Sequence, residues 1–86
     1  MLFRSNRIGT YNPETDSPDD LQKITGLGPI VEKDLNKLGI HTYDQVSKLE
    51  EQDYLAIEAL IPAFSAETAK TENWAGQALN LKNNKL

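Results

Sequence analysis

The sequence predicts an all-α fold, a compact bundle of about five short helices in one domain. Apolar residues recur every three or four positions along most of the chain, and glycine or proline interrupts that pattern at short intervals. No segment alternates between apolar and polar residues as a half-buried strand would. The length of 86 residues fits a single domain with a small core.

The helical domain is expected to occupy residues 17–81. Residues 1–16 are polar and lack helical periodicity, which predicts a flexible tail or a linker from an upstream segment. Residues 82–86, "KNNKL", are expected to fray. The tail has three larger apolar side chains that could dock on the domain, although a segment of this composition is expected to stay off it: Phe3, Ile8 and Tyr11.

Two short helices are predicted on either side of the stretch "TGLGP". Ser17 is expected to cap the first helix, with Pro18 at its first position, and Gly26 is expected to end it. Pro29 begins the second helix, and Gly39 ends it. The residues expected on the buried faces are Leu21 and Ile24 in the first helix, and Val31, Leu35 and Leu38 in the second.

The end of the second helix and the start of the third carry specific capping patterns. With the glycine after the second helix in a left-handed conformation, Ile40 would contact Leu35 in a Schellman motif. Thr42 and Gln45 match a capping box, which predicts a short third helix over residues 43–48.

Two further helices are predicted in the second half of the chain. The fourth ends at Pro62, because proline cannot continue a helix. Residues 65–71 are expected to form a connector with about one helical turn, and Thr71 is expected to cap the last helix. The predicted buried positions are Tyr54, Ile57 and Ile61 in the fourth helix, and Trp74, Ala78 and Leu81 in the last.

Three conspicuous side chains have a structural interpretation that we favour over a functional one. Trp74 is expected to anchor the core rather than to stack on a ligand. Gln77 is expected to bridge to backbone groups. His41, which is the single histidine, follows the cap of the second helix and is expected to lie in solvent.

The stretch "GLGP" can reverse the chain between the first two helices. Gly26 can adopt a positive φ, and Leu27 is expected to point into the groove between the helices. Gly28 has no side chain, so another molecule can approach its backbone closely. Pro29 sets φ for the new helix. The exposed amides of such a turn, with a helix N-terminus behind them, attract anions such as phosphate.

These residues resemble a known family. "LQKITGLGPIVEKDLNKLGI" is similar to a helix-hairpin-helix motif, in which an apolar residue and Gly-apolar-Gly precede a second helix. The longer run to "TENWAGQALNL" resembles a family of small bacterial helix-hairpin-helix domains with a SAM-like five-helix fold. The matching segments are "GLGP", "LGIHTYDQ" and the Trp-x-x-Gln-Ala pattern near the C-terminus. Members are sometimes labelled flap-endonuclease-like, a label that follows from the hairpin alone.

The resemblance implies weak, sequence-nonspecific binding to the backbone of nucleic acid, in particular duplex DNA. In such domains the hairpin amides hold a phosphate and nearby cations support it. The chain also resembles domains that have a second, degenerate hairpin. Here that second hairpin would be formed by the third and fourth predicted helices. The residues that the resemblance assigns to nucleic-acid binding are Gly26, Leu27, Gly28, Pro29, Ile30, Lys33 and Lys37.

Two positions depart from the motif and disfavour tight binding. DNA-binding members commonly have a lysine or arginine where this chain has Ile30, and many have an alanine where it has Glu32. A carboxylate in the first helical turn suits the helix dipole but repels phosphate. Few cations could assist. Lys23, Lys33 and Lys37 lie near the hairpin in the sequence, and the arginines of the tail could contribute only if the tail folded over it.

Charge and composition narrow the function classes further. The formal charge is −4, and residues 42–61 carry one lysine against five acids, so no basic face is evident. The chain has no cysteine and one histidine, and its acids are expected mostly on outward faces near helix starts, so neither a metal site nor a catalytic constellation is expected. No cofactor is implied, and no apolar run is long enough to span a membrane.

Two hypotheses stay open, and both are non-enzymatic. In the first, the chain binds nucleic acid through the hairpin. In the second, it is a protein-interaction or structural domain of a larger protein, and the hairpin serves packing alone. In either case we expect a cytoplasmic, monomeric domain.

Overall fold

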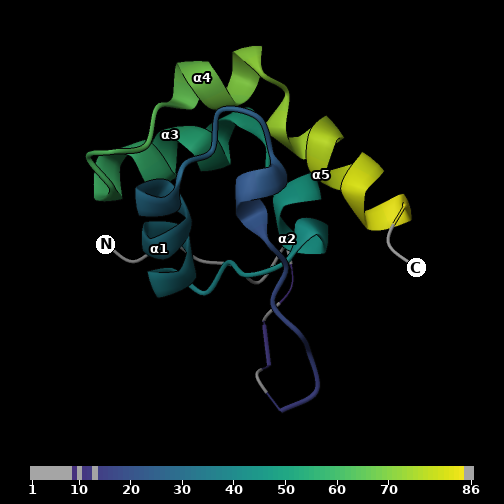
Figure 1. Cartoon of the computed structure of the whole chain (residues 1–86). Helices are drawn as coiled ribbons and strands as arrows, with labels where there is room; N and C mark the ends of the chain where they lie inside the picture. Colours follow the sequence, from purple (N-terminus) through teal and green to yellow (C-terminus); the bar gives the residue numbers. More distant parts are fainter. Residues whose placement is uncertain (1–8, 10, 13, 85–86) are drawn as a thin grey trace.

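The computed structural model describes residues 9, 11, 12 and 14–84, and these form five α-helices and one short 3₁₀ helix (Figure 1). In chain order the elements are η1 (Leu21–Lys23), α1 (Pro29–Lys37), α2 (Tyr43–Ser47), α3 (Glu51–Leu60), α4 (Ala66–Thr71) and α5 (Trp74–Asn83). The described residues contain no strand, so the predicted all-α class is confirmed.

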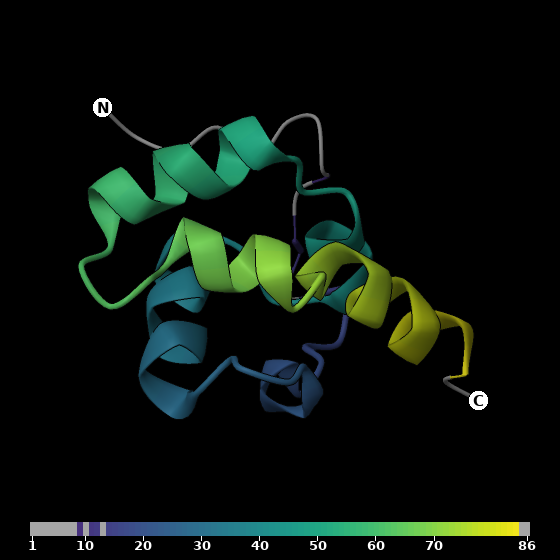
Figure 2. The ribbon, with the colours of Figure 1, turned by 90° about the horizontal axis from the view of Figure 1, so that it is seen from above.

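The helices surround one small core. Figure 2 shows α3 and α4 side by side, with η1 and α1 on the opposite side of the molecule and α5 following α4 in sequence. Helix α5 packs on α2. The largest fully buried side chains come from most of these elements and the segments between them: Leu21, Ile24, Leu35, Ile40, Val46, Ile57 and Trp74.

The predicted caps around α1 and α2 are confirmed. Gly39 has φ +89°, and the Ile40 N–H donates to the Leu35 carbonyl at 3.0 Å, as a Schellman motif requires. Both of those apolar side chains are fully buried. The Thr42 hydroxyl accepts from the Gln45 N–H at 3.2 Å, while the Gln45 Oε1 accepts from the Thr42 N–H at 3.1 Å.

The predicted start of the first helix is wrong. Only one 3₁₀ turn forms, and its N-cap is Asp20, which accepts from the Gln22 N–H. Residues 16–20 are not helical, and Asp19 is bound to another helix instead: its carboxylate accepts from the Tyr43 N–H at 2.8 Å, at the start of α2. Ser17 therefore caps no helix.

The C-terminal elements also differ from the prediction. The expected connector contains a true helix, α4, capped by the Ser65 hydroxyl. Asn73, not Thr71, caps α5, and it does so in a left-handed conformation with φ +53°. Helix α5 continues to Asn83, so Lys82 and Asn83 are helical rather than frayed.

Part of the N-terminal segment lies on the domain, contrary to expectation. The Tyr11 ring packs on the His41 ring with centroids 4.1 Å apart, so the histidine is partly covered rather than free in solvent. The Gly9 carbonyl accepts from the Gln45 Nε2 at 3.0 Å. Phe3 and Ile8 lie outside the described residues. None of the described helices has the length and apolar character of a membrane span.

Candidate functional site

The hairpin turn between η1 and α1 has an inner half, Thr25 to Leu27, that is held by α5. The Thr25 N–H donates to the Gln77 Oε1 at 2.8 Å, and its carbonyl accepts from the Trp74 Nε1 at 3.0 Å. Gln77 also donates to the Glu72 carbonyl at 2.7 Å, so it bridges two backbone segments as predicted. The inner half is therefore fixed by hydrogen bonds across about fifty residues of sequence.

Gly26, in the middle of the turn, lies close to side chains at the end of α4 and the start of α5. Gly26 has φ +91°, and a Cβ atom at this position would lie 3.3 Å from the Glu72 side chain and 3.4 Å from the Trp74 Nε1. Leu27 is buried in the core between the helices, as expected. These two residues are accounted for by folding, and the Leu27 side chain is not available to a ligand.

The outer half of the turn, Gly28 to Ile30, is open. Gly28 has φ −91°, a conformation that any residue can adopt, and nothing lies within 4 Å of a Cβ built there. The N–H groups of Gly28, Ile30 and Val31 have no hydrogen-bond partner among the described residues. Pro29 is exposed at the first position of α1, and the Ile30 side chain is 67% exposed. An anion could reach these amides, although an aliphatic side chain stands beside them.

Glu32 performs a structural task that its position in the motif did not suggest. Its Oε2 accepts from the Leu21 N–H at 2.8 Å, and its Oε1 accepts from the Gln22 Nε2 at 2.8 Å. The carboxylate thus satisfies an amide at the positive end of η1 and joins the two arms of the hairpin. It is hydrogen-bonded to the first arm of the hairpin, and it still places a negative charge in the first turn of α1.

The predicted cations are only partly brought together. Lys33 is exposed one turn into α1 and, like Lys23, makes no ion pair with another described residue. Lys37 lies about 12 Å further along the axis than Pro29, and its Nζ is 4.0 Å from Asp34. Helix α1 carries two acids and two lysines, so it has no net charge. The arginines of the tail lie outside the described residues.

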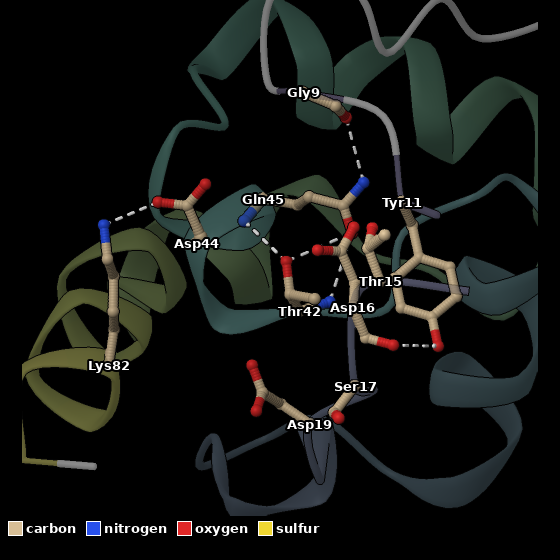
Figure 3. A pocket seen from close by; sticks show the side chains of 10 residues that line it. All are labelled: Gly9, Tyr11, Thr15, Asp16, Ser17, Asp19, Thr42, Asp44, Gln45 and Lys82. Carbon is tan, nitrogen blue, oxygen red and sulfur yellow. Dashed lines mark hydrogen bonds and ion pairs between the residues drawn. The ribbon is translucent and has the colours of Figure 1, made fainter. Parts of the chain in front are cut away.

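A second concave site lies beside the start of α2, where Gln45 is one of its lining residues (Figure 3). Its volume is about 340 Å³. The Gln45 Nε2 donates to the Gly39 carbonyl at 2.9 Å as well as to Gly9, so this buried amide ties the N-terminal segment to the end of α1. The residues that line it are Gly9, Tyr11, Thr15, Asp16, Ser17, Asp19, Thr42, Asp44, Gln45 and Lys82.

The acids of that cavity are already engaged in the fold. The Asp16 carboxylate accepts from the Asn12 N–H at 2.8 Å, and Asp19 binds the start of α2. Asp44 accepts from Lys82 at 2.6 Å and from Lys48 at 3.0 Å (Figure 3 shows the first). These two lysines, Lys82 first, hold the pKa of the Asp44 carboxyl below its ordinary value. Among the described residues no group of three or more histidine, aspartate or glutamate side chains could hold a metal ion.

Sequence reasoning missed two features that matter for function. It predicted Gln77 as a backbone bridge but not its partner, because Thr25 lies 52 residues away. It also missed an exposed apolar face on α3, although "YLAIEALIPA" is apolar at almost every position and cannot bury all of its side chains on one face.

The family model and the individual relatives that match this chain agree with each other. A family model described as the RS2/RL21/YNQ2 HHH domain, where HHH denotes helix-hairpin-helix, matches residues 21–82. A large ribosomal subunit protein bL21 of Mesorhizobium japonicum is 45% identical over 64 residues, which are 74% of this chain and 27% of the relative. A small ribosomal subunit protein uS2 of Methylobacterium sp. (strain 4-46) is 34% identical over 62 residues, which are 72% of this chain and 17% of the relative.

A further bL21, of Hyphomonas neptunium, is 40% identical over 63 residues and is covered to 30% of its length. The chain thus spans less than a third of each of these relatives. No solved structure matches. The shared segment includes both arms of the hairpin and most of α5.

Proposed function

The chain belongs to the RS2/RL21/YNQ2 helix-hairpin-helix domain family, and we propose that it serves as a non-catalytic structural and protein-interaction module of a ribosome-associated assembly. The observation that carries this proposal is the state of the hairpin. Its inner half is bound to α5 through Thr25, and Glu32 joins its two arms, so the turn is explained by packing.

The relatives support a role that is independent of any one host protein. Segments similar to this chain occur in relatives named as bL21, of the large ribosomal subunit, and in others named as uS2, of the small one. A module found in two differently named proteins, and covering less than a third of each, is expected to supply an added contact rather than the main activity. We extend that expectation to this chain.

Co-sedimentation tests the proposal. The full chain is mixed with ribosomal subunits from the organism that encodes it and centrifuged through a sucrose cushion, and the chain centrifuged alone is the control. We expect the chain to pellet with the subunits, and we expect an excess of duplex DNA not to displace it. A chain that stays in the supernatant at micromolar subunit concentration would contradict the proposal.

Binding to a nucleic-acid backbone is the second candidate, and one observation favours it. The N–H groups of Gly28, Ile30 and Val31, which have no partner among the described residues, lie at the start of α1, with Lys33 one turn away. Phosphate binds well at such helix starts. With so few cations available, the affinity would be low and would fall steeply with salt.

Amide NMR titrations distinguish the two candidates. Duplex DNA or ribosomal RNA is added at low salt, and the salt concentration is then raised. Binding through the hairpin would shift the amides of Gly28 and Ile30 reversibly, and Ile30→Lys would strengthen it by adding a cation. If the hairpin amides stay unmoved at millimolar nucleic acid, and Ile30→Lys brings no gain, the second candidate is wrong.

A further inference from the structure

Helix α3 exposes an apolar surface on the side opposite to its buried face. Tyr54, Ile57 and Ile61 point into the core. The solvent side carries a set of apolar residues that we call the α3 outer face: Leu55, Ala56, Ala59, Leu60 and Ala63, all of them exposed. Leu55 is 55% exposed. Within residues 52–63, the exposed polar residues are Gln52 and Glu58.

A groove adjoins this face between α3 and α4. Its volume is about 360 Å³, and Leu55 and Ala66 supply the apolar part of its lining. Glu51, Glu58, Glu67 and Lys70 supply the charged part. The two helices lie side by side in both views (Figures 1 and 2), so the groove follows the seam between them. A large aliphatic side chain from another molecule could lie against Leu55 in this groove.

The charge around the groove is negative. Three glutamates face one lysine, and that lysine is neutralised because the Lys70 Nζ lies 3.1 Å from the Glu51 carboxylate. The Glu58 carboxylate is fixed in place, since its Oε2 accepts from the Ala66 N–H at 2.8 Å. Glu67 is exposed and makes no ion pair with another described residue. Within the part of the chain that the structure describes, the rim therefore has two carboxylates without an ion-pair partner, Glu58 and Glu67, beside an apolar floor.

We propose that the α3 outer face and this groove dock a cationic amphipathic helix of a partner protein. An aliphatic side chain of that helix would bury itself beside Leu55 and Ala66, and lysine or arginine side chains would meet Glu58 and Glu67. The alanines at positions 56, 59 and 63 allow a helix to approach closely. This inference deepens the proposed interaction function and rests on it for the assembly to which the partner belongs.

The negative charge of the rim favours a cationic helix over two other possible occupants, a nucleic-acid backbone and a second copy of the chain. A phosphate backbone would be repelled by the glutamates of the rim. A second copy of the chain, docked face to face, would bring its own glutamates against them, because the face offers no unpaired lysine in return. A helix with an apolar stripe between basic residues satisfies both the floor and the rim.

A pair of synthetic peptides tests the proposal by NMR on the full chain. One is a 14-residue helix-forming peptide with leucines at helical spacing and lysines elsewhere, and the other replaces every lysine with glutamate. We expect the lysine peptide to shift the amides of Leu55, Ala59 and Glu67, with an affinity that falls as salt rises. The glutamate peptide is expected to bind at least tenfold more weakly. Equal binding of both peptides, or shifts centred on the hairpin, would overturn the proposal.

Surface variants sharpen the test without disturbing the core. Leu55→Ser should weaken binding of the lysine peptide about tenfold by removing apolar contact, and Glu67→Lys should weaken it while improving binding of the glutamate peptide. Leu79→Ser is the matched control, since Leu79 is 47% exposed on α5. An equal loss with Leu79→Ser would sink the assignment of the site.

The same variants separate this inference from the proposed function. If the chain pellets with ribosomal subunits and Leu55→Ser does not reduce that binding, the docking surface is wrong while the module function stands. If the lysine peptide binds at Leu55 but the chain does not pellet, the docking surface stands and the ribosomal assignment fails.

Discussion

The two halves of the hairpin turn are built differently, although the sequence places them side by side. In the inner half, Gly26 has a positive φ and is packed against α4 and α5. In the outer half, Gly28 has an ordinary conformation and an open surrounding. The difference teaches that the two glycines of a Gly-x-Gly motif can meet separate requirements. The first allows the backbone to turn and pack, and the second leaves the backbone amides open to another molecule. We expect that only the first is needed for the chain to fold.

Gly26→Ala should give the largest loss of stability. The left-handed conformation costs a residue with a side chain about 1–2 kcal/mol, and the new Cβ would also crowd Glu72 and Trp74. We expect the free energy of unfolding to fall by about 2 kcal/mol, measured by urea denaturation with tryptophan fluorescence.

Gly39→Ala is the matched control for that change. Gly39 has a similar φ of +89°, but nothing lies within 4 Å of a Cβ built there. It should therefore show the backbone cost without the crowding. If both substitutions cost the same, the contact of the inner half with α4 and α5 contributes nothing and the contrast between the halves is weaker than we infer.

Glu32→Ala tests the link between the two arms of the hairpin. It removes the acceptor of the Leu21 N–H, which is partly buried. An amide left without a partner costs about 1 kcal/mol or more, and we expect a loss of about that size in the same urea experiment. Glu32→Gln keeps one oxygen acceptor and should recover part of it. A loss below about 0.3 kcal/mol in Glu32→Ala would mean that water replaces the carboxylate.

Which of these features can be predicted from sequence depends on how far apart the partners lie. The Schellman contact of Ile40 with Leu35 and the capping box of Thr42 with Gln45 involve residues within five positions, and both were predictable. Ser17 was predicted to cap the first helix, but Asp20 caps η1 and the neighbouring Asp19 carboxylate binds the start of α2, 24 residues away. Local patterns show that a residue can cap a helix and do not show which helix.

The same limit applies to the candidate site. The residues of the hairpin were predictable from "GLGP", but its attachment to Trp74 and Gln77 requires knowing where α5 lies. The buried face of α3 was predictable, since Tyr54, Ile57 and Ile61 are buried as expected, but the sequence did not show that no neighbouring element covers Leu55 on the other side. Tertiary contacts, and not propensity, decide these cases.

The inner half of the turn is held by α5, and α5 is joined to α2 by the ion pair between Lys82 and Asp44. Since this ion pair requires a charged carboxylate, we expect the stability of the fold to depend weakly on pH. Lys82 of α5 and Lys48 hold the pKa of Asp44 below its ordinary value. A depressed pKa in the folded state contributes stability above the ordinary pKa, and that contribution disappears as the pH falls through the folded pKa. It should therefore be lost below about pH 4.

Asp44→Asn isolates this contribution. Because the pair is exposed, we expect the variant to lose only about 0.5 kcal/mol near pH 7, with the two proteins converging in acid and in high salt. Urea denaturation at several pH values measures the difference. A constant difference across the whole pH range would show that the charge of Asp44 is not its source.

Gly28→Ser should have the smallest effect on stability and the clearest meaning for the outer half. The position is the N-cap of α1, it has no side-chain cap, and its φ of −91° and ψ of 176° suit serine. We expect the free energy of unfolding to rise by a few tenths of a kcal/mol, because the hydroxyl can accept from a free amide of the first turn. Gly28→Ala, which adds a side chain without an acceptor, is the control and should be neutral or slightly destabilising. A loss above about 1 kcal/mol in either variant would mean that the outer half, like the inner half, is required for folding, and the distinction between the two glycines would fail.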